Sequence, residues 1–330
     1  SCPFEMSKYS CAHQGSTKQH NTSGASVAYM AKHHHLLNSA FGSPFPAMRV
    51  LLTGDSLMKQ LFISIACVAR HHHSVRSRTY SGSDSPPHIT VDWEQAWPCH
   101  GTPNCVRSGQ HSGFNRGSVF FAGGGEVHFV PLDGHAPTRT SRQSEEPNIL
   151  ARILGEAERI DRVTFGRKTI GSPRGDPDVI FVNAGIHNAR ASLALRNFAD
   201  KLDQLNTSTN LPEVVWVTTP TQHFPTASGQ YESRSSAIAN NAWCVERVAR
   251  NPRADMERTI LQGRTGVLRH MLEYDDLGLG ALHIGLRDCT HYCMPGIPDV
   301  MAARMVLHLR AATTRQRSFD RLRRRVVSGA

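Results

Sequence analysis

The sequence predicts an α/β fold with a mainly parallel central sheet, and three observations indicate it. Short apolar runs of strand length alternate with longer segments whose apolar residues have helical spacing. The strand-like runs are apolar at successive positions, which is typical of strands buried on both faces of a parallel sheet. The chain has 330 residues, 39% apolar and 19% charged, which suffices for a sizeable core.

The first predicted elements follow a polar stretch. Residues 1–47 are rich in Ser, His and Gly, and we expect an irregular lead-in packed on the main domain. Met48–Leu52 is an apolar strand that stops at Thr53-Gly54-Asp55-Ser56. Leu57–Ala69 follows with apolar residues at helical spacing, so the sequence predicts a strand, a tight turn and a helix.

The rest of the chain continues the alternation. A loop-rich region is predicted over 70–118, and two short strands are predicted within Val119–Val130, around a glycine turn. Two further buried strands are predicted at Asp178–Asn183 and Val214–Thr218. The predicted helices are Ile149–Ile160, Leu193–Leu205, Arg264–Leu277 and Pro298–Ala311. We therefore expect one main domain over residues 48–311, followed by a basic tail over 312–330.

The net charge of +10 is concentrated near the C-terminal end. From Leu309 onward there are seven Arg and one Asp. Such a segment could contact nucleic acid, an anionic glycan or a membrane surface, but a solvated end is the simpler interpretation. Because no zinc-finger, RNA-recognition or helix-turn-helix pattern accompanies the arginines, we expect no nucleic-acid partner.

Eight cysteines without a CxxC pair predict disulfides in an oxidising compartment rather than structural zinc. Asn21-Thr22-Ser23 and Asn206-Thr207-Ser208 match the glycosylation pattern. The chain begins with Ser, shows no signal peptide and has no apolar run near the ~20 residues of a spanning helix. We expect a processed luminal or extracellular chain of the secretory pathway, in contact with a membrane only through an anchor upstream. The oligomeric state stays open.

Ser56 is the first candidate for chemistry. It lies at the predicted strand-to-helix turn, where backbone N–H groups and the positive end of the helix dipole could stabilise an oxyanion. The alternative is a serine that only caps the helix. The surrounding residues do not match the Gly-x-Ser-x-Gly nucleophile elbow.

Asp288 and His291 are the second candidates, within a segment flanked by Cys289 and Cys293. A serine nucleophile needs a base, and the base needs an acceptor that orients it. Asp and His three residues apart on one turn can point the same way, so Asp288 would orient His291 toward Ser56. The alternative is a surface turn held by the two cysteines.

Asn183 ends a predicted strand at the same sheet edge as Ser56, where its amide could donate to an oxyanion; a turn-forming role is the alternative. His187 and His223 also follow strand ends and could line the cleft, although local hydrogen bonding is the simpler explanation of each. The runs His33-His34-His35 and His71-His72-His73 are predicted to lie in solvated loops, because adjacent residues in regular structure do not converge on one ion. We expect no metal.

Four segments together resemble one family, and one of them carries most of the likeness. Asp288-Cys289-Thr290-His291-Tyr292-Cys293-Met294-Pro295-Gly296-Ile297-Pro298-Asp299 resembles a family block that reads Asp-Cys-Ser-His-Trp-Cys-Leu-Pro-Gly-x-Pro-Asp. The others are Cys2-Pro3-Phe4 with Cys11, Val50–Leu57 and Asp178–Gly185. By these segments the chain resembles the PC-esterase/trichome-birefringence-like family of the SGNH (GDSL-type) hydrolase superfamily.

The resemblance implies a three-layer α/β/α fold stapled by disulfides, with Ser56 as nucleophile, His291 as base and Asp288 as its orienter. Asn183 and the Ser56 backbone N–H would form the oxyanion hole, with a further glycine donor for which Gly113 and residues 123–125 are weak candidates. Further cleft candidates are Asp55, Lys59, Gly185, His187 and His223. The matched cysteines would pair as Cys2–Cys67, Cys11–Cys293 and Cys244–Cys289, which leaves Cys99–Cys105 without a family counterpart.

The family resemblance implies a carbohydrate O-acetyltransferase that acts on a glycan or polysaccharide, with acetyl-CoA or an acetyl ester as co-substrate and no bound cofactor. A glycan O-acetylesterase and a non-catalytic glycan-binding module are the alternatives. The sequence departs from the plant pattern after Ser56, where it reads Leu57-Met58-Lys59-Gln60-Leu61, and at Asn183-Ala184-Gly185-Ile186-His187, where a Trp pair is absent. These departures argue against a plant wall polymer as the substrate, but not against the chemistry.

Overall fold

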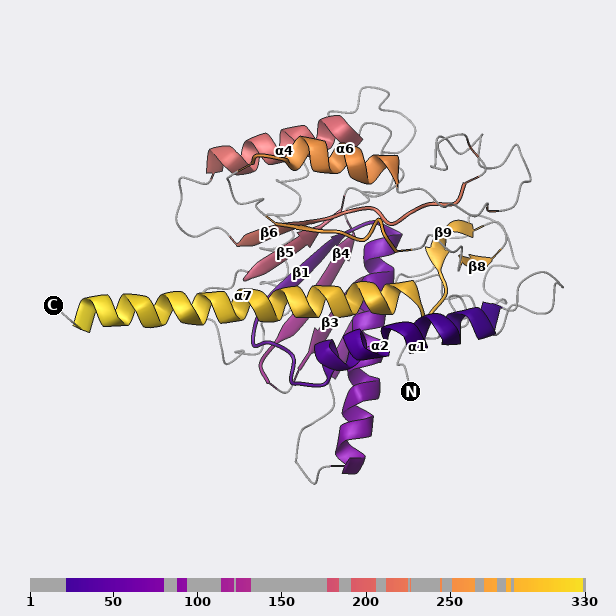
Figure 1. The fold of residues 1–330 in the computed structure, drawn as a ribbon, viewed down its shortest axis with the longest axis horizontal. Helices are drawn as coiled ribbons and strands as arrows, with labels where there is room; N and C mark the ends of the chain where they lie inside the picture. The colour runs from indigo at the N-terminus through magenta and orange to yellow at the C-terminus, as the bar shows by residue number, and fades with distance from the viewer. Residues whose placement is uncertain are drawn as a thin grey trace.

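A seven-stranded sheet forms the centre of the structure, in the order β2-β3-β4-β1-β5-β6-β7 (Figure 1). The computed structural model describes residues 22–79, 88–93, 114–121, 123–131, 177–183, 191–205, 212–224, 226, 244, 251–264, 270–277, 283–285 and 288–328. The strands of this sheet are β1 (Arg49–Gly54), β2 (His88–Trp93), β3 (Phe114–Phe120), β4 (Glu126–Pro131), β5 (Val179–Val182), β6 (Glu213–Val217) and β7 (His270–Leu272). A separate two-stranded sheet pairs β8 (His283–Gly285) with β9 (Asp288–Tyr292).

The predicted mainly parallel sheet is confirmed. β4, β1, β5, β6 and β7 run parallel to one another, whereas β3 is antiparallel to β4 and β2 is antiparallel to β3. The predicted strand pair around the glycine turn forms the β3–β4 hairpin. The sheet is therefore mixed, with its antiparallel strands at one side.

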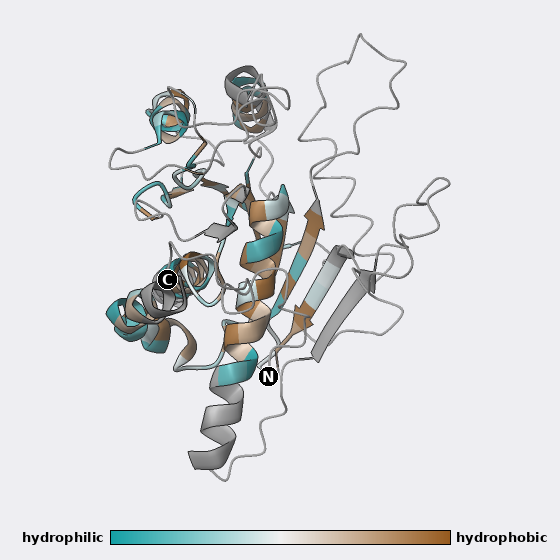
Figure 2. Ribbon diagram, turned by 90° about the vertical axis from the view of Figure 1, so that its right-hand side faces the viewer, coloured by the Kyte–Doolittle hydropathy of each residue, from teal (hydrophilic) through white to brown (hydrophobic). Residues whose placement is uncertain are grey.

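Helices cover both faces of the sheet, which gives three layers (Figure 1). The helices are α1 (Thr22–Phe41), α2 (Ser56–Thr79), α4 (Ala191–Leu205), α6 (Pro252–Leu261) and α7 (Ile297–Ser328). Val50 and Leu52 of β1 pack in one core with α1, α2 and α7, while Leu51 belongs to a second core with α4 and α6. Alternation along a strand thus explains why the whole apolar run is buried. Figure 2 shows apolar residues along the central strands and on the helix beside them.

The last helix is the longest described, with 32 residues, and it packs against both α1 and α2. Arg310 on this helix donates to the backbone oxygens of Ala40, Ser43 and Pro44, at the turn between α1 and β1. Figure 1 shows its C-terminal half running out beyond the body of the molecule. None of the helices within the described ranges combines the length and apolar character required of a membrane span.

Several predicted elements need correction. The lead-in predicted to be irregular contains α1, so His33-His34-His35 lie in a helix, and His71-His72-His73 lie in the extension of α2 to Thr79. In these polar, histidine-rich stretches the apolar residues lie on only one face of the helix. The composition therefore does not indicate a helix. Likewise α7 continues from the predicted Pro298–Ala311 through most of the basic tail.

A second correction concerns Arg264–Leu277, which was expected to be a helix. It contains the edge strand β7 and a turn over residues 275–277. The apolar residues of this stretch fit either period, and pairing with β6 decides for a strand. β2 and α6 were not predicted, and the predicted helix Ile149–Ile160 lies outside the described residues.

Candidate active site

The carboxyl edge of β1 is the natural place for a site in this topology. β1 has β4 on one side and β5 on the other, so the strand order changes direction at its end. In open parallel sheets, ligands bind at such a point, outside the carboxyl ends of the strands. Ser56 is the first residue of α2, directly after this edge, and Asn183 directly follows β5. The backbone N–H of Asn183 donates to the Thr53 oxygen at 3.1 Å, which joins the two strand ends.

Asp55 carries the cap of α2, so Ser56 is not needed for it. The Asp55 carboxylate accepts from the Leu57 N–H at 2.9 Å, and its backbone oxygen accepts the first helical bond, from the Lys59 N–H at 3.1 Å. These are the contacts of an N-cap residue. Asp55 is buried, whereas Ser56 and Lys59 are half-buried. The helix is therefore capped by Asp55 and not by Ser56. Ser56 is the first residue of the helix, and its side chain is not used for the cap.

Gly54 is required by close packing at this turn. A Cβ at Gly54 would lie 2.4 Å from the Met58 Cγ and 3.0 Å from the backbone oxygen of Asn183. The first distance is too short for a real Cβ, and the second, to a backbone atom, is tighter than ordinary contact. The glycine therefore lets the first turn of α2 approach the end of β5.

The strand that carries His291 is linked to α2 by one side chain. The Gln60 Nε2 donates to the Tyr292 backbone oxygen at 2.9 Å, and the Tyr292 N–H donates to the Gln60 Oε1 at 3.2 Å. Gln60 lies one helical turn after Ser56, and Tyr292 is the neighbour of His291. The structure thus brings the element with the predicted base to the first turns of the helix that begins with the predicted nucleophile. His291 itself is half-buried.

The local structure of Asp288 and His291 differs from the prediction. They lie in strand β9, not on a turn, and β9 pairs with β8. Along a regular strand, side chains three residues apart point to opposite faces, so the expected alignment on one turn does not apply. The Asp288 side chain lies outside the described part of the structure, and its role as the orienter stays a prediction.

The Asn183 amide is bonded to the end of β6. Its Nδ2 donates to the Val217 oxygen at 2.7 Å and to the Thr219 hydroxyl at 3.2 Å. Two hydrogens are available on this nitrogen. To donate to an oxyanion, Asn183 would exchange the longer bond, that to Thr219, for the new one. The oxyanion role of Asn183 therefore stays a prediction, and it requires that Asn183 give up its hydrogen bond to Thr219.

Thr219 is held in turn by a buried carboxyl group on α6. Its N–H and hydroxyl both donate to Glu257, each at 3.2 Å. Asn251 caps α6 and donates to the backbone oxygens of Thr219 and Pro220, both at 2.9 Å. Burial raises the pKa of the Glu257 carboxyl, while Arg253 at 3.4 Å and the bonds from Thr219 oppose that rise. This network fixes the segment that follows β6.

The same segment reaches β9. His223 is fully buried, and its N–H donates to the Cys289 oxygen at 3.4 Å. The Tyr292 hydroxyl donates to the Thr221 oxygen, and the Thr221 hydroxyl donates to the Asp275 oxygen at 2.8 Å. His223 therefore helps to hold β9 through its backbone. Gly185 and His187 lie outside the described residues.

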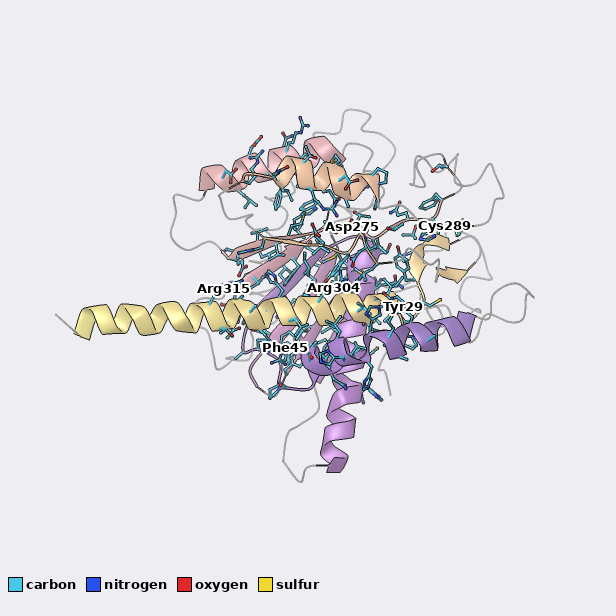
Figure 3. The ribbon with its side chains drawn as sticks, in the orientation of Figure 1. Tyr29, Phe45, Asp275, Cys289, Arg304 and Arg315 are labelled. Atoms are coloured by element: carbon cyan, nitrogen blue, oxygen red, sulfur yellow. A yellow bond between two sulfur atoms is a disulfide. The ribbon has the colours of Figure 1, made fainter. Side chains whose placement is uncertain are left out.

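The predicted Cys244–Cys289 disulfide is present, with 5.2 Å between the Cα atoms, and it tethers β9 at Cys289 (labelled in Figure 3). Cys67 and Cys293 are also disulfide-bonded. Their predicted partners Cys2 and Cys11 lie outside the described residues, as do Cys99 and Cys105.

The glycine turn does not lie at this edge. Residues 123–125 join β3 to β4 at the amino end of β4, next to Arg49, whereas Ser56 follows the carboxyl end of β1. These glycines are therefore wrong as oxyanion donors. Pro131 of β4 lies opposite Gly54, so β4 ends at the same sheet edge as β1, where Ser56 follows. That chain and Gly113 lie outside the described residues.

Gln60 and Tyr292 were not singled out from the sequence. A signal was present for Gln60, because it is a polar residue one turn after Ser56 on a helix whose neighbouring residues Leu57, Met58 and Leu61 are buried. Its partner, 232 residues later, could not be inferred. Over the part of the chain that the structure describes, no group of three or more His, Cys, Asp or Glu side chains is arranged to hold a metal ion.

No family model, curated protein or solved structure matches this chain. What stands on the geometry is an α/β fold with a mixed, mostly parallel sheet and a disulfide that tethers β9. Ser56 and Asn183 follow the carboxyl ends of the neighbouring strands β1 and β5, and the strand that carries His291 is hydrogen-bonded to α2.

Proposed function

We propose that the protein is a carbohydrate O-acetyltransferase that works through an acyl-enzyme on Ser56. The observation that carries the proposal is the pair of hydrogen bonds between Gln60 and Tyr292. They hold the strand of His291 against the helix of Ser56, at the sheet edge where this topology binds ligands. The resemblance of the segment around Asp288 and His291 to the acyl-transferring family supports the same chemistry.

The proposed reaction has two steps. His291 takes the hydroxyl proton of Ser56 as the serine oxygen bonds to the acetyl carbon of an acetyl ester or thioester. The donor's alcohol or thiol leaves with the proton from His291. In the second step His291 takes a proton from a sugar hydroxyl, whose oxygen bonds to the acetyl carbon, and the released Ser56 oxygen recovers that proton. The Ser56 N–H and the Asn183 amide would stabilise the oxyanion of each step.

The first test is the mass of the intact protein after brief exposure to an activated acetyl ester and an acid quench. We expect one added acetyl group on the parent protein and none on Ser56→Ala. Ser43→Ala is the matched control, because Ser43 is an exposed loop serine that should leave labelling unchanged. If Ser56→Ala takes up acetyl and consumes the ester as fast as the parent, the proposed nucleophile is wrong.

The second test distinguishes transfer from hydrolysis. The acetylated protein is divided between buffer and solutions of neutral and anionic oligosaccharides, and loss of the acetyl group is followed by mass. A transferase should lose it faster with one glycan, with acetyl appearing on that glycan. Equal rates of acetyl loss in buffer and in every glycan would favour the esterase. If the parent protein consumes the acetyl ester no faster than buffer alone does, a binding module would be favoured.

A further inference from the structure

Gln60 is a buried amide whose two polar ends serve one residue of another element. Its side chain is 1% exposed, and it accepts from the N–H of Tyr292 and donates to the oxygen of Tyr292. A primary amide carries an acceptor and a donor side by side, so it can pair with both backbone groups of one residue. Gln60 therefore acts on β9 as a neighbouring strand would, although it belongs to a helix.

The bonded residues are each close to a proposed catalytic residue. Along α2, Gln60 is four residues after Ser56, an axial rise of about 6 Å on the same side of the helix. Along β9, Tyr292 directly follows His291. The path from the backbone of Ser56 to that of His291 thus consists of one helical turn, the Gln60 side chain held by two hydrogen bonds, and one peptide unit.

Other contacts fix β9 from the opposite direction. The Tyr292 hydroxyl donates to the Thr221 oxygen, and Cys289 is tethered to Cys244. These contacts join β9 to the segment after β6. The two hydrogen bonds of Gln60 join it to α2.

We propose that Gln60 is a positioning residue that sets the distance between the Ser56 oxygen and His291. The inference rests on the proposed function of Ser56 and His291. Gln60 touches neither the substrate nor the reacting atoms and acts through the backbone of Tyr292. A displacement of about 1 Å between reacting groups can cost a hundredfold in rate. Loss of the amide should therefore lower the rate of acylation and leave substrate binding almost unchanged.

The test compares Gln60→Met, which keeps the length of the side chain and removes both hydrogen bonds, with Gln60→Glu, which keeps the acceptor and loses the donor. We expect kcat for an activated acetyl ester to fall about 10- to 100-fold in Gln60→Met, with KM within about twofold. Relative to the parent at the same pH, Gln60→Glu should retain a larger fraction of the activity at low pH, where a protonated carboxyl can still donate to Tyr292, than at neutral pH. The Tyr292 amide should exchange its hydrogen faster in Gln60→Met.

The matched control is Ser64→Ala, on the same helix and one turn further on. The Ser64 hydroxyl donates to Asp299 on α7, so this variant loses a buried interhelical bond that does not involve β9. It should lower the free energy of unfolding and leave kcat unchanged. A kcat loss in Ser64→Ala equal to that in Gln60→Met would show a general effect of stability and overturn the inference.

The two proposals fail in different ways. If the parent protein is never acetylated at Ser56, the proposed function fails. If the parent is acetylated and both Gln60 variants, folded by circular dichroism, react at the parental rate, only the role of Gln60 fails. If Gln60→Met does not fold, the Gln60→Glu pH profile decides alone, and a profile parallel to that of the parent overturns the inference.

Discussion

At the scale of single residues, the turn from Gly54 to Ser56 divides three tasks among three neighbours. Gly54 permits the close approach to β5, Asp55 caps α2, and Ser56, which is not needed for the cap, is the proposed nucleophile. A Gly-Asp-Ser turn in a sequence is compatible with a simple helix cap. The hydrogen bond from Leu57 to Asp55 shows which of the three residues carries it.

The Gly54 requirement gives a prediction at this scale. Gly54→Ala should force Met58 aside and press on the Asn183 backbone, with a loss of about 1–3 kcal/mol in the free energy of unfolding, as is usual for overpacking. Acetylation at Ser56 should slow as well. Chemical denaturation and acetyl labelling measure the two effects. Gly123→Ala is the control, because its added Cβ would lie no closer than 3.6 Å to another atom, and equal losses in both variants would contradict the packing argument.

At the scale of elements, the start of α7 is joined to α2 by a buried carboxyl group. Asp299 accepts from the Gly296 N–H at 2.6 Å and from the Ser64 hydroxyl. The bond back to the residue before the helix is half of a capping box. Burial raises the pKa of Asp299 to about 6, although both hydrogen bonds lower it. Burial therefore keeps this carboxyl group protonated to a higher pH than an exposed aspartic acid.

This pKa predicts a pH dependence of stability. Because the folded value of about 6 exceeds the unfolded value of about 4, the group contributes stability that is fully present below pH 4 and lost as the pH rises through 6. The contribution is about 3 kcal/mol for a shift of about two pKa units. Urea denaturation should show a decline between pH 4 and pH 6 in the parent that is absent in Asp299→Asn.

Asparagine suits this comparison, because its amide can accept from Gly296 and donate to the Ser64 hydroxyl. Asp276→Asn is the control for charge alone, since Asp276 pairs with Arg304 of the same helix at an exposed site (Arg304 is labelled in Figure 3). The decline should persist in Asp276→Asn. A parallel decline in Asp299→Asn would show that another group is responsible.

At the scale of the whole molecule, the candidate site is assembled from segments far apart in the chain. Ser56 follows β1, Asn183 follows β5 and His291 lies in β9, after the parallel sheet is complete. β9 belongs to its own small sheet and is held by a disulfide, by backbone bonds and by the Gln60 amide. Its position is thus set by individual contacts rather than by the central sheet.

The disulfide gives a prediction at this scale. Replacing Cys244 and Cys289 together by Ala should remove about 4 kcal/mol of stabilisation in the chain-entropy model, since the bridge spans 45 residues. Acetylation at Ser56 should fall further than the loss of folded protein explains, because His291 loses a tether. Labelling and denaturation under the same conditions test this. A Cys99→Ala/Cys105→Ala variant is the control, and an equal loss of labelling there would refute a specific role for the tether.

An element can be predicted from the sequence when nearby residues determine it, and it is missed when contacts with distant parts of the chain determine it. The central strands were predicted correctly, because burial on both faces makes them apolar at every position, as in Val50-Leu51-Leu52. α1 was missed because its histidines mask one apolar face, and β7 was taken for a helix because only pairing with β6 distinguishes the two. The Ser56–Asn183 edge followed from the strand ends. The link from Gln60 to Tyr292 did not, because no local pattern reports a contact across 232 residues.

The contact of Arg310 with the turn between α1 and β1 has a consequence for the order of synthesis. A ribosome makes α1 and β1 early, yet the carbonyl oxygens of Ala40, Ser43 and Pro44 obtain this partner only when α7 emerges. Until then, this face of the sheet lacks the cover of α7, and Phe181 of β5 lacks its contact with His308. A nascent chain in this state exposes apolar surface of the kind that chaperones bind. Completion of the domain therefore waits for the translation of its last helix.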